Sequence, residues 1–326
     1  MRALASLPVA VALAVLAAGC EGAPAAAPTL SAIPSPATPI PSTGPYVALA
    51  LVPTSATTVT VANFDQLRVR FGVPDLTSSD PMSDRLAFWE QVDDKAVALT
   101  GGLFRAESST WELDYGFTED DVDWEVHWTG PDGSGYAVGF RPDLDLAGVD
   151  RAVRREPALE GALLVRHVLE KGQETDGHSW ADDPMWGDYV VGDAETAYLR
   201  QGCVPLDRAL ADAAVDDAKA QRVREIVPDL EPLDRWSVSF ADGIVTALIG
   251  GRRGDVVART DLGDQWPRTR PMSFVDGFAQ PLDDPRAGRI GYQVVDPHAA
   301  AALTLGEGLP FPVCNVSIPV IEPTGL

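Results

Sequence analysis

The chain of 326 residues is 45% hydrophobic, which is enough apolar material for the packed core of one or two domains. Its 25 Lys and Arg face 48 Asp and Glu, and the net charge of −23 excludes nucleic acid as an expected partner, because a negative surface repels phosphate backbones. Cationic partners, metal ions and neutral ligands stay open. An acidic surface that keeps an exported protein soluble is the simplest interpretation of the charge.

The first residues have the plan of an export signal. Residues 3–18 form an apolar run that is shorter than the roughly 20 residues of a spanning helix and typical of a signal peptide. The run ends in LAAGC at 16–20, which resembles the lipobox of bacterial lipoproteins, although that family usually has Leu where Ala17 stands. The resemblance implies that residues 1–19 are removed and that Cys20 becomes the lipidated first residue. An ordinary secretory leader with an incidental cysteine is the alternative.

Residues 20–45 consist mostly of Pro, Ala, Ser and Thr, a composition that predicts an extended tether and not a fold. Lipobox, Pro/Ala tether and acidic α+β domain together resemble lipoproteins of high-GC Gram-positive bacteria. The resemblance implies a location at the extracytoplasmic face of the cell membrane, with the membrane as a partner through the two acyl chains of the anchor. It implies no activity and no site residue.

The rest of the chain is expected to form an α+β fold, with antiparallel sheets that carry helices on one face. We divide it into a first half, 46–200, and a second half, 201–326. In the first half, alternating and helical spacings predict a strand at 57–64, helices at 65–71 and 83–97 (capped by Ser83), a strand at 110–117, a hairpin at 122–128 and 136–140, a helix at 146–155 capped by Asp145, and strands at 162–169 and 189–192.

The second half has fewer signals. They predict a helix at 206–227, a hairpin at 236–240 and 244–249, a helix at 297–303 and a strand at 313–320. The segment WEVHW, 124–128, followed by a turn and an apolar strand, is echoed by WSVSF at 236–240. The echo indicates two similar halves, and a chance likeness of two amphipathic hairpins is the alternative.

Two cysteines remain in the domain once Cys20 is set aside. An oxidising compartment favours their pairing, and we predict a disulfide between Cys203 and Cys314 that connects the start of the second half to the C-terminal segment. Free buried thiols and pairing with another protein are the alternatives. A redox role is not expected, because the chain has no Cys-x-x-Cys to lower a thiol pKa.

One motif approximates a hydrolase signature. The segment GHSWA at 177–181 is close to the G-x-S-x-G turn that exposes a nucleophilic serine, and an Asp and His298 follow Ser179 in the order that such hydrolases use. However, Ala181 replaces the last glycine, and no strand leads directly into the motif. Ser179 and His298 are therefore weak catalytic candidates, and the sequence predicts no enzyme.

The best candidate site is the polar loop that contains this motif, at 171–188, and the strand start after it. Aromatic rings beside carboxylates can bind sugars by stacking and by hydrogen bonds to hydroxyls, and loops on rigid scaffolds often carry function. The alternative is a loop folded over its own aromatic residues. The candidate ligand-binding residues are Trp180, Asp182, Asp183, Trp186, Asp188 and Tyr189.

No cofactor or metal site is expected. The acidic run at 119–125 could bind a hard cation such as calcium, but its alternation favours a solvated strand entry. The four histidines show no zinc-ligand spacing.

The sequence therefore predicts a binding or interaction module at the cell envelope, whose partner is a protein, a glycan or a small ligand. A carrier for lipid or another apolar ligand is the first alternative, and a serine hydrolase that uses 177–188 is the second. An apolar cavity between sheet and helices would favour the carrier.

Overall fold

The structure, a computed structural model, describes residues 44–172, 177–210, 218–268 and 272–314. The lipobox with Cys20 and nearly all of the tether lie outside these residues, so the export signal and the lipid anchor stay predictions. Residues 211–217 of the predicted helix at 206–227 and residues 315–320 of the predicted last strand also lie outside them.

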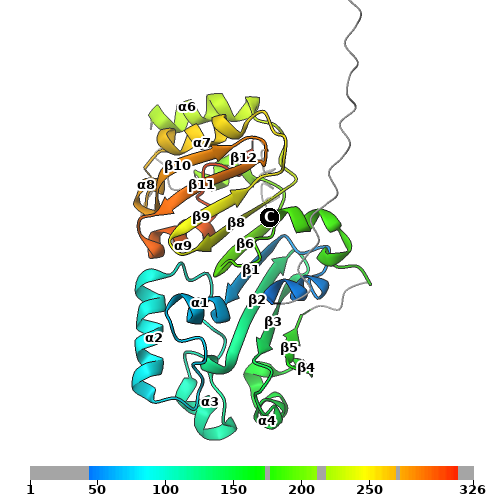
Figure 1. Cartoon of the computed structure of the whole chain (residues 1–326). Helices are drawn as coiled ribbons and strands as arrows, with labels where there is room; N and C mark the ends of the chain where they lie inside the picture. The colour runs from blue at the N-terminus through cyan, green and yellow to red at the C-terminus, as the bar shows by residue number, and fades with distance from the viewer. Residues whose placement is uncertain (1–43, 173–176, 211–217, 269–271, 315–326) are drawn as a thin grey trace, which may run out of the picture. The chain divides into compact units, whose positions relative to one another are not determined.

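In the described residues, a sheet of ten strands has the order β10-β11-β9-β8-β6-β1-β2-β3-β5-β4 (Figure 1). Every neighbouring pair in this sheet is antiparallel. The fold is therefore α+β with an antiparallel sheet, as predicted. The strands are β1 Thr58–Asn63, β2 Val122–Gly130, β3 Gly133–Phe140, β4 Leu163–Val165, β5 Val168–Lys171, β6 Thr196–Gln201, β8 Arg235–Ala241, β9 Ile244–Leu248, β10 Phe278–Asp284 and β11 Arg289–Val294.

The order of strands repeats outward from the centre of the sheet. One side reads β1-β2-β3-β5-β4 and the other reads β6-β8-β9-β11-β10. In both series the central strand pairs with a first hairpin, β2–β3 or β8–β9, and a second hairpin, β4–β5 or β10–β11, completes the series. The later strand of the second hairpin lies next to the first hairpin. Both sides also have helices after the central strand and between the two hairpins. The second series begins with β6, which spans the predicted boundary at 200. A closer similarity of the two halves stays a prediction.

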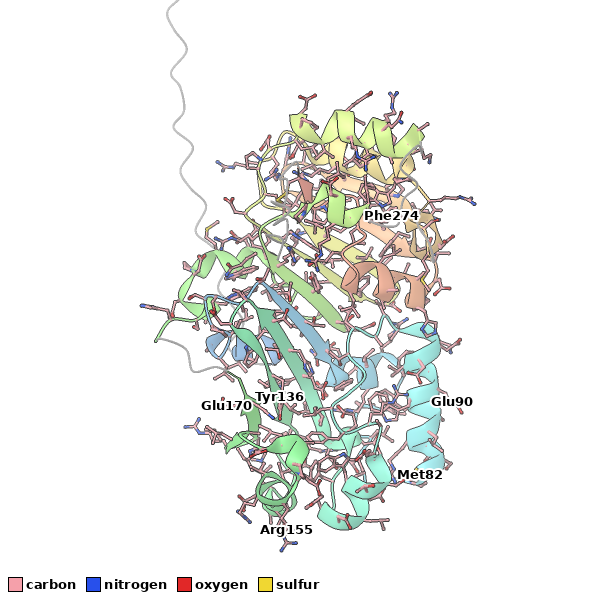
Figure 2. The ribbon with its side chains drawn as sticks, turned by 180° about the vertical axis from the view of Figure 1, so that it is seen from behind. Met82, Glu90, Tyr136, Arg155, Glu170 and Phe274 are labelled. Atoms are coloured by element: carbon pink, nitrogen blue, oxygen red, sulfur yellow. A yellow bond between two sulfur atoms is a disulfide. The ribbon has the colours of Figure 1, made fainter. Side chains whose placement is uncertain are left out.

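The α-helices form two groups on one face of the sheet. The first group packs on Ala62, Val138 and their neighbours, and the second packs on Val238, Val245 and theirs; cross-strand pairing places all four side chains on the same face. The first group is α1 Phe64–Arg70, α2 Met82–Lys95, α3 Ser108–Tyr115 and α4 Ala147–Arg155, and the second is α5 Leu206–Ala209, α6 Ala218–Ile226, α7 Val256–Gln265, α8 Phe274–Gly277 and α9 Pro297–Leu305 (Figures 1 and 2).

Short 3-10 helices cover the middle of the opposite face. Their apolar side chains pack on Val59, Val61, Val126 and Leu199, which alternate along the central strands with the residues of the helical face. These helices are η1 Pro45–Ala50, η4 Trp180–Asp182 and η5 Pro184–Tyr189; three others are η2 Glu119–Asp121, η3 Pro157–Leu159 and η6 Val227–Asp229.

Several predicted elements are wrong, for local reasons. Segment 110–117 belongs to helix α3 and not to a strand, because Trp111 and Tyr115 lie one turn apart and Gly116, with φ 79°, ends the helix in the left-handed region. The predicted strand at 162–169 is a hairpin, β4 and β5, that turns at Arg166 with φ 56°. Residues 189–192 form no strand, and Ser83 lies inside α2, whose N-cap is Pro81. The pattern missed β6, β10, β11 and α7.

The predicted disulfide between Cys203 and Cys314 is confirmed, with the two Cα atoms 5.7 Å apart. Cys203 precedes β7 Val204–Pro205, Cys314 is the last residue of β12 Val313–Cys314, and the two strands pair in parallel. The bond therefore connects the start of the second helix group to the last described residues.

Removal of the disulfide by Cys203→Ala together with Cys314→Ala should lower the free energy of unfolding by about 4–5 kcal/mol, since the bond closes a long loop and so restricts the unfolded chain. Urea unfolding with and without reductant measures this effect. The reductant should destabilise the parent chain and leave the double variant unchanged; equal sensitivity of the two would contradict the expectation.

Two tryptophans of β2 lie against glycines of the neighbouring strand β3. Register pairs Trp124 with Gly139 and Trp128 with Gly135. A Cβ at Gly139 would come within 2.1 Å of the Trp124 ring, and one at Gly135 within 2.3 Å of the Trp128 ring. The glycines thus leave the space in which the two rings lie on the sheet.

Gly139→Ala should cost about 2 kcal/mol of unfolding free energy, because the new methyl group must displace a packed indole ring. Gly192→Ala is the matched control: nothing lies within 4 Å of its added Cβ, so its stability should change by less than about 0.5 kcal/mol. Thermal and urea unfolding of both variants would show whether contact with the Trp124 ring is the reason that position 139 requires glycine.

Candidate functional site

A polar groove lies on the helical face, over the central strands β1, β2 and β6. The groove is open to solvent and has a volume of about 410 Å³. The floor of the groove consists of residues that are paired across neighbouring strands. Thr60 lies opposite Tyr198, and Thr58 lies between Thr129 and Arg200. Its lining, called the central groove below, consists of Thr57, Thr58, Thr60, Thr129, Gly130, Tyr198, Arg200, Arg208, Leu305 and Glu307.

The groove is polar because threonine and valine side chains alternate between the two faces of β1. Val59 and Val61 point into the apolar cluster on the opposite face, so Thr58 and Thr60 must point to the helical face. The Thr58 and Thr129 hydroxyls lie 2.6 Å apart across the strands and share a hydrogen bond. Threonine is compatible with a strand and also supplies a group that donates and accepts hydrogen bonds.

Glu307 organises the charged wall of the groove. Its carboxylate is 2% exposed and accepts hydrogen bonds from the Tyr198 hydroxyl, at 3.0 Å, and from Arg200. A second ion pair joins it to Arg208 Nε at 2.6 Å. Glu307 follows α9 and adopts φ 56°, a conformation that costs a residue with a side chain on the order of 1 kcal/mol or more. The contacts of the carboxylate offset this backbone cost.

The two arginines differ in their exposure. Arg200 Nε is buried and has no hydrogen-bond partner among the described residues. Arg208 has a side chain that is 56% exposed. Burial and the Glu307 charge both raise the pKa of Tyr198, so its hydroxyl stays protonated and donates at neutral pH. Two guanidinium groups face one carboxylate, which gives the groove wall a net charge of one positive unit in an acidic protein.

A pair of buried carboxyl groups lies further along the same face of β2. Glu125 is 0% exposed; it accepts a hydrogen bond from the Leu103 N–H at 2.6 Å and lies 3.1 Å from His127 Nε2. Glu119, also 0% exposed, accepts from the Phe104 N–H at 2.7 Å. The two glutamates therefore hold consecutive amides of the segment that leads into α3.

The pKa of Glu119 is raised well above its ordinary value. Burial is the main cause, and the nearby Glu125 carboxylate is the second. Two carboxylates in contact in an apolar interior cannot both be charged without a large cost. Glu119 is therefore the protonated member of the pair and donates to Glu125.

The expectation that the acidic run at 119–125 is a solvated strand entry is wrong. Glu119, Asp120, Asp121 and Glu125 are all buried. Cations and polar groups from α1 and α2 reach the aspartates. Arg68 pairs with Asp123 at 2.6 Å, Arg85 pairs with Asp120 at 3.3 Å, and the Trp89 ring N–H donates to Asp120 at 2.8 Å.

Glu119→Gln should flatten the pH dependence of stability. The folded chain keeps a proton on Glu119 that the unfolded chain releases above the ordinary pKa of 4.5. The stability from this proton is therefore full below pH 4.5 and is lost as the pH rises, by up to about 1.4 kcal/mol per pH unit. A glutamine amide donates to Glu125 at every pH and accepts from Phe104, so it avoids this loss.

Urea unfolding at pH 5 and at pH 8 measures the difference. The unfolding free energy of the variant minus that of the parent chain should be more positive at pH 8 than at pH 5. Glu90→Gln, on the outer side of α2, is the control and should keep the slope of the parent chain (Figure 2). Equal slopes in all three proteins would mean that Glu119 is ionised in the fold.

The predicted ligand-binding loop is folded over its own aromatic residues. Trp180 and Trp186 stack at 4.0 Å, and they and Tyr189 are buried beneath η1 on the opposite face from the groove. Asp182 accepts from the Ser179 N–H at 2.7 Å, and Asp183 pairs with Arg235 at 2.6 Å.

Asp188 is exposed in the same loop. A ligand-binding role for the loop stays a prediction, which the burial of its ring faces does not favour.

The weak catalytic candidates lie on different faces of the sheet. Ser179 is 8% exposed, and its Oγ lies 3.4 Å from Asp182. His298 is exposed on α9, which packs on the helical face. Among the described residues, no hydrogen bond joins the two side chains. The structure gives no support to the hydrolase alternative.

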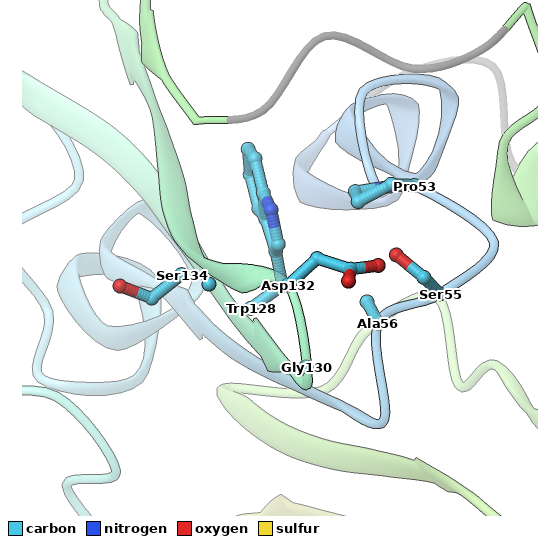
Figure 3. A pocket seen from close by; sticks show the side chains of 8 residues that line it. Pro53, Ser55, Ala56, Trp128, Gly130, Asp132 and Ser134 are labelled. Carbon is cyan, nitrogen blue, oxygen red and sulfur yellow. The ribbon is translucent and has the colours of Figure 1, made fainter.

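A smaller hollow opens beside the turn between β2 and β3. Figure 3 shows the Trp128 ring and Asp132 on one side of it and Pro53 and Ser55 on the other. The side chains leave no space of the size of a water molecule. This hollow is therefore a packing defect around Trp128 and no ligand site.

In the described part of the chain, no group of three or more His, Cys, Asp or Glu side chains is arranged to hold a metal ion. None of the helices described there is both long and apolar enough to cross a membrane.

Sequence reasoning missed the central groove. The alternation of threonines in TTVTVANF was a signal for it, because one face of that strand had to be polar. Arg200, Arg208 and Glu307 gave no signal, since they are brought together from separate elements.

Comparisons with known proteins give little. No protein family and no curated protein matches the chain. Solved structures that resemble it include crystal form III and crystal form I of TP0453, with 6% sequence identity and a TM-score of 0.30 in both cases. The matches cover 79% and 80% of this chain and 97% of the other. A likeness at this level carries no argument about function.

Proposed function

We propose that this protein is a lipid-anchored, extracytoplasmic binding module whose central groove takes a small polar ligand or a polar part of an envelope partner. The lipobox resemblance at Cys20 and the Pro/Ala tether support the anchored location. The central groove supports the binding role, and it is the observation on which the proposal rests.

The groove has the properties of a ligand site. Its 410 Å³ falls in the range of about 300–1,000 Å³ of small-molecule pockets. Its polar groups are held in place before any ligand arrives, Thr58 by Thr129 and both arginines by Glu307. Preorganised groups lose little conformational entropy on binding, which leaves more of the contact energy as affinity.

The groove also bears on the carrier alternative. An apolar cargo would require an apolar lining, because buried hydroxyl and guanidinium groups without partners cost free energy. The floor of this groove consists of hydroxyls and its wall is charged, with Leu305 as its large apolar side chain. The lining therefore favours a polar ligand over a lipid chain.

Cys20→Ala tests the anchor. The parent chain should be processed and fractionate with the membrane, whereas the variant should stay unprocessed or be released to the medium. Identical fractionation of the two chains would contradict the lipid anchor.

Photo-cross-linking in intact cells tests the groove. A photoreactive amino acid in place of Thr58, on the groove floor, should capture a ligand or partner and add mass to the protein. The same residue in place of Glu90, exposed on α2, is the control and should capture nothing in common with it. Failure to capture anything at Thr58, or the same adducts at both positions, would overturn the binding role of the groove.

A further inference from the structure

We infer that the central groove binds an oxyanion, a carboxylate or a phosphate, carried on a small hydroxyl-bearing molecule of about monosaccharide size. This inference rests on the proposed function and names the ligand class for the same groove. Arg200 and Arg208 would hold the oxyanion, and the threonine row would contact the hydroxyls.

The two guanidinium groups on the groove wall argue for an anion. Arg200 lines the groove, donates to Glu307 and is 8% exposed; its buried Nε has no hydrogen-bond partner among the described residues. Arg208 pairs with Glu307 through Nε at 2.6 Å, and it lines the groove with a side chain that is 56% exposed. Guanidinium groups match the geometry of carboxylate and phosphate oxygens.

Glu307 orients the arginines and does not neutralise them both. It accepts from Arg200 and pairs with Arg208, so the two guanidinium groups are held near one point of the groove. One positive charge remains for a ligand. The carboxylate is fixed by the Tyr198 hydroxyl as well, so the arrangement is rigid before binding.

The net charge of −23 does not decide against an anion. At physiological ionic strength the Debye length is about 8 Å, so acidic side chains farther away than this are largely screened. Direct contacts with two guanidinium groups act at hydrogen-bond distance and are screened much less. The acidic surface would slow the approach of an anion more than it would weaken the bound complex.

The floor and volume define the rest of the ligand. Thr58, Thr60 and Thr129 present hydroxyls, each of which can donate and accept a hydrogen bond. Hydroxyl groups on a ligand match this surface better than apolar or purely cationic groups. A volume of 410 Å³ corresponds to roughly a dozen water molecules, which suits one sugar ring with its oxyanion.

Calorimetric titration of the full chain in detergent tests the inference with four probes: glucuronate, glucose 6-phosphate, glucose and inorganic phosphate. The parent chain should bind glucuronate or glucose 6-phosphate at least about tenfold more tightly than both glucose and inorganic phosphate. If inorganic phosphate binds as tightly as glucose 6-phosphate, the inference that the ligand carries hydroxyl groups is wrong. If glucose binds as tightly as glucuronate, the inference that the ligand carries an oxyanion is wrong.

Arg208→Gln should weaken binding of the tighter anion about tenfold or more, because it removes a charged donor. Its side chain is exposed, and Glu307 keeps its contacts with Arg200 and Tyr198, so the variant should fold and melt only a few degrees below the parent chain. Arg154→Gln, an exposed arginine on α4, is the matched control and should bind like the parent chain. Equal affinity of the Arg208 variant and the parent chain would overturn the inference.

The binding role of the groove and the oxyanion inference can be contradicted by different results. An adduct at Thr58 in cells, together with no binding of any anionic probe, overturns the oxyanion inference and leaves the binding role of the groove. Loss of the adduct overturns the proposed function. Competition of glucuronate or glucose 6-phosphate with the Thr58 adduct would support both.

Discussion

The pairing of β1 with β6 is the constraint on which the rest of the structure depends. These strands join the two series of strands into one sheet, through five cross-strand pairs from Thr58–Arg200 to Ala62–Thr196. Each series then carries its own helices on the same face. The two helix groups leave the part of the central strands around Thr58, Thr60 and Arg200 partly uncovered. The groove is a consequence of this pairing of β1 with β6.

Several arginines are buried in the fold and are paired there with carboxylates and carbonyl groups. Arg259 is 0% exposed and donates to the carbonyls of Phe311 and Val313 while it pairs with Asp255 at 2.7 Å. It therefore holds the segment that the disulfide also fixes. Arg68 and Arg85 play the same part for the acidic run in the first half. Loss of one partner in such a pair leaves an uncompensated buried charge, which costs more than the pair contributes.

The groove and the buried carboxyl pair occupy neighbouring positions on one strand face. Along β2, Thr129 lines the groove, His127 follows two residues away, and Glu125 follows two residues beyond it. His127 contacts Glu125 and lies opposite Thr60, a floor residue. A continuous polar track thus connects the groove to the segment held by the two glutamates.

The sequence by itself determined the class of fold, the hairpins at β2–β3 and β8–β9, and the disulfide, because alternation, turn residues and cysteine number are local or countable signals. It also carried the export and anchor predictions, which rest on residues 1–45. Only the tertiary structure decided that the acidic run is buried and that the aromatic loop covers itself. It alone brought Arg200 and Glu307 together across 107 positions of the chain. The physical reason is that burial and charge pairing depend on which surfaces meet, and a pattern within one segment does not contain its distant neighbours.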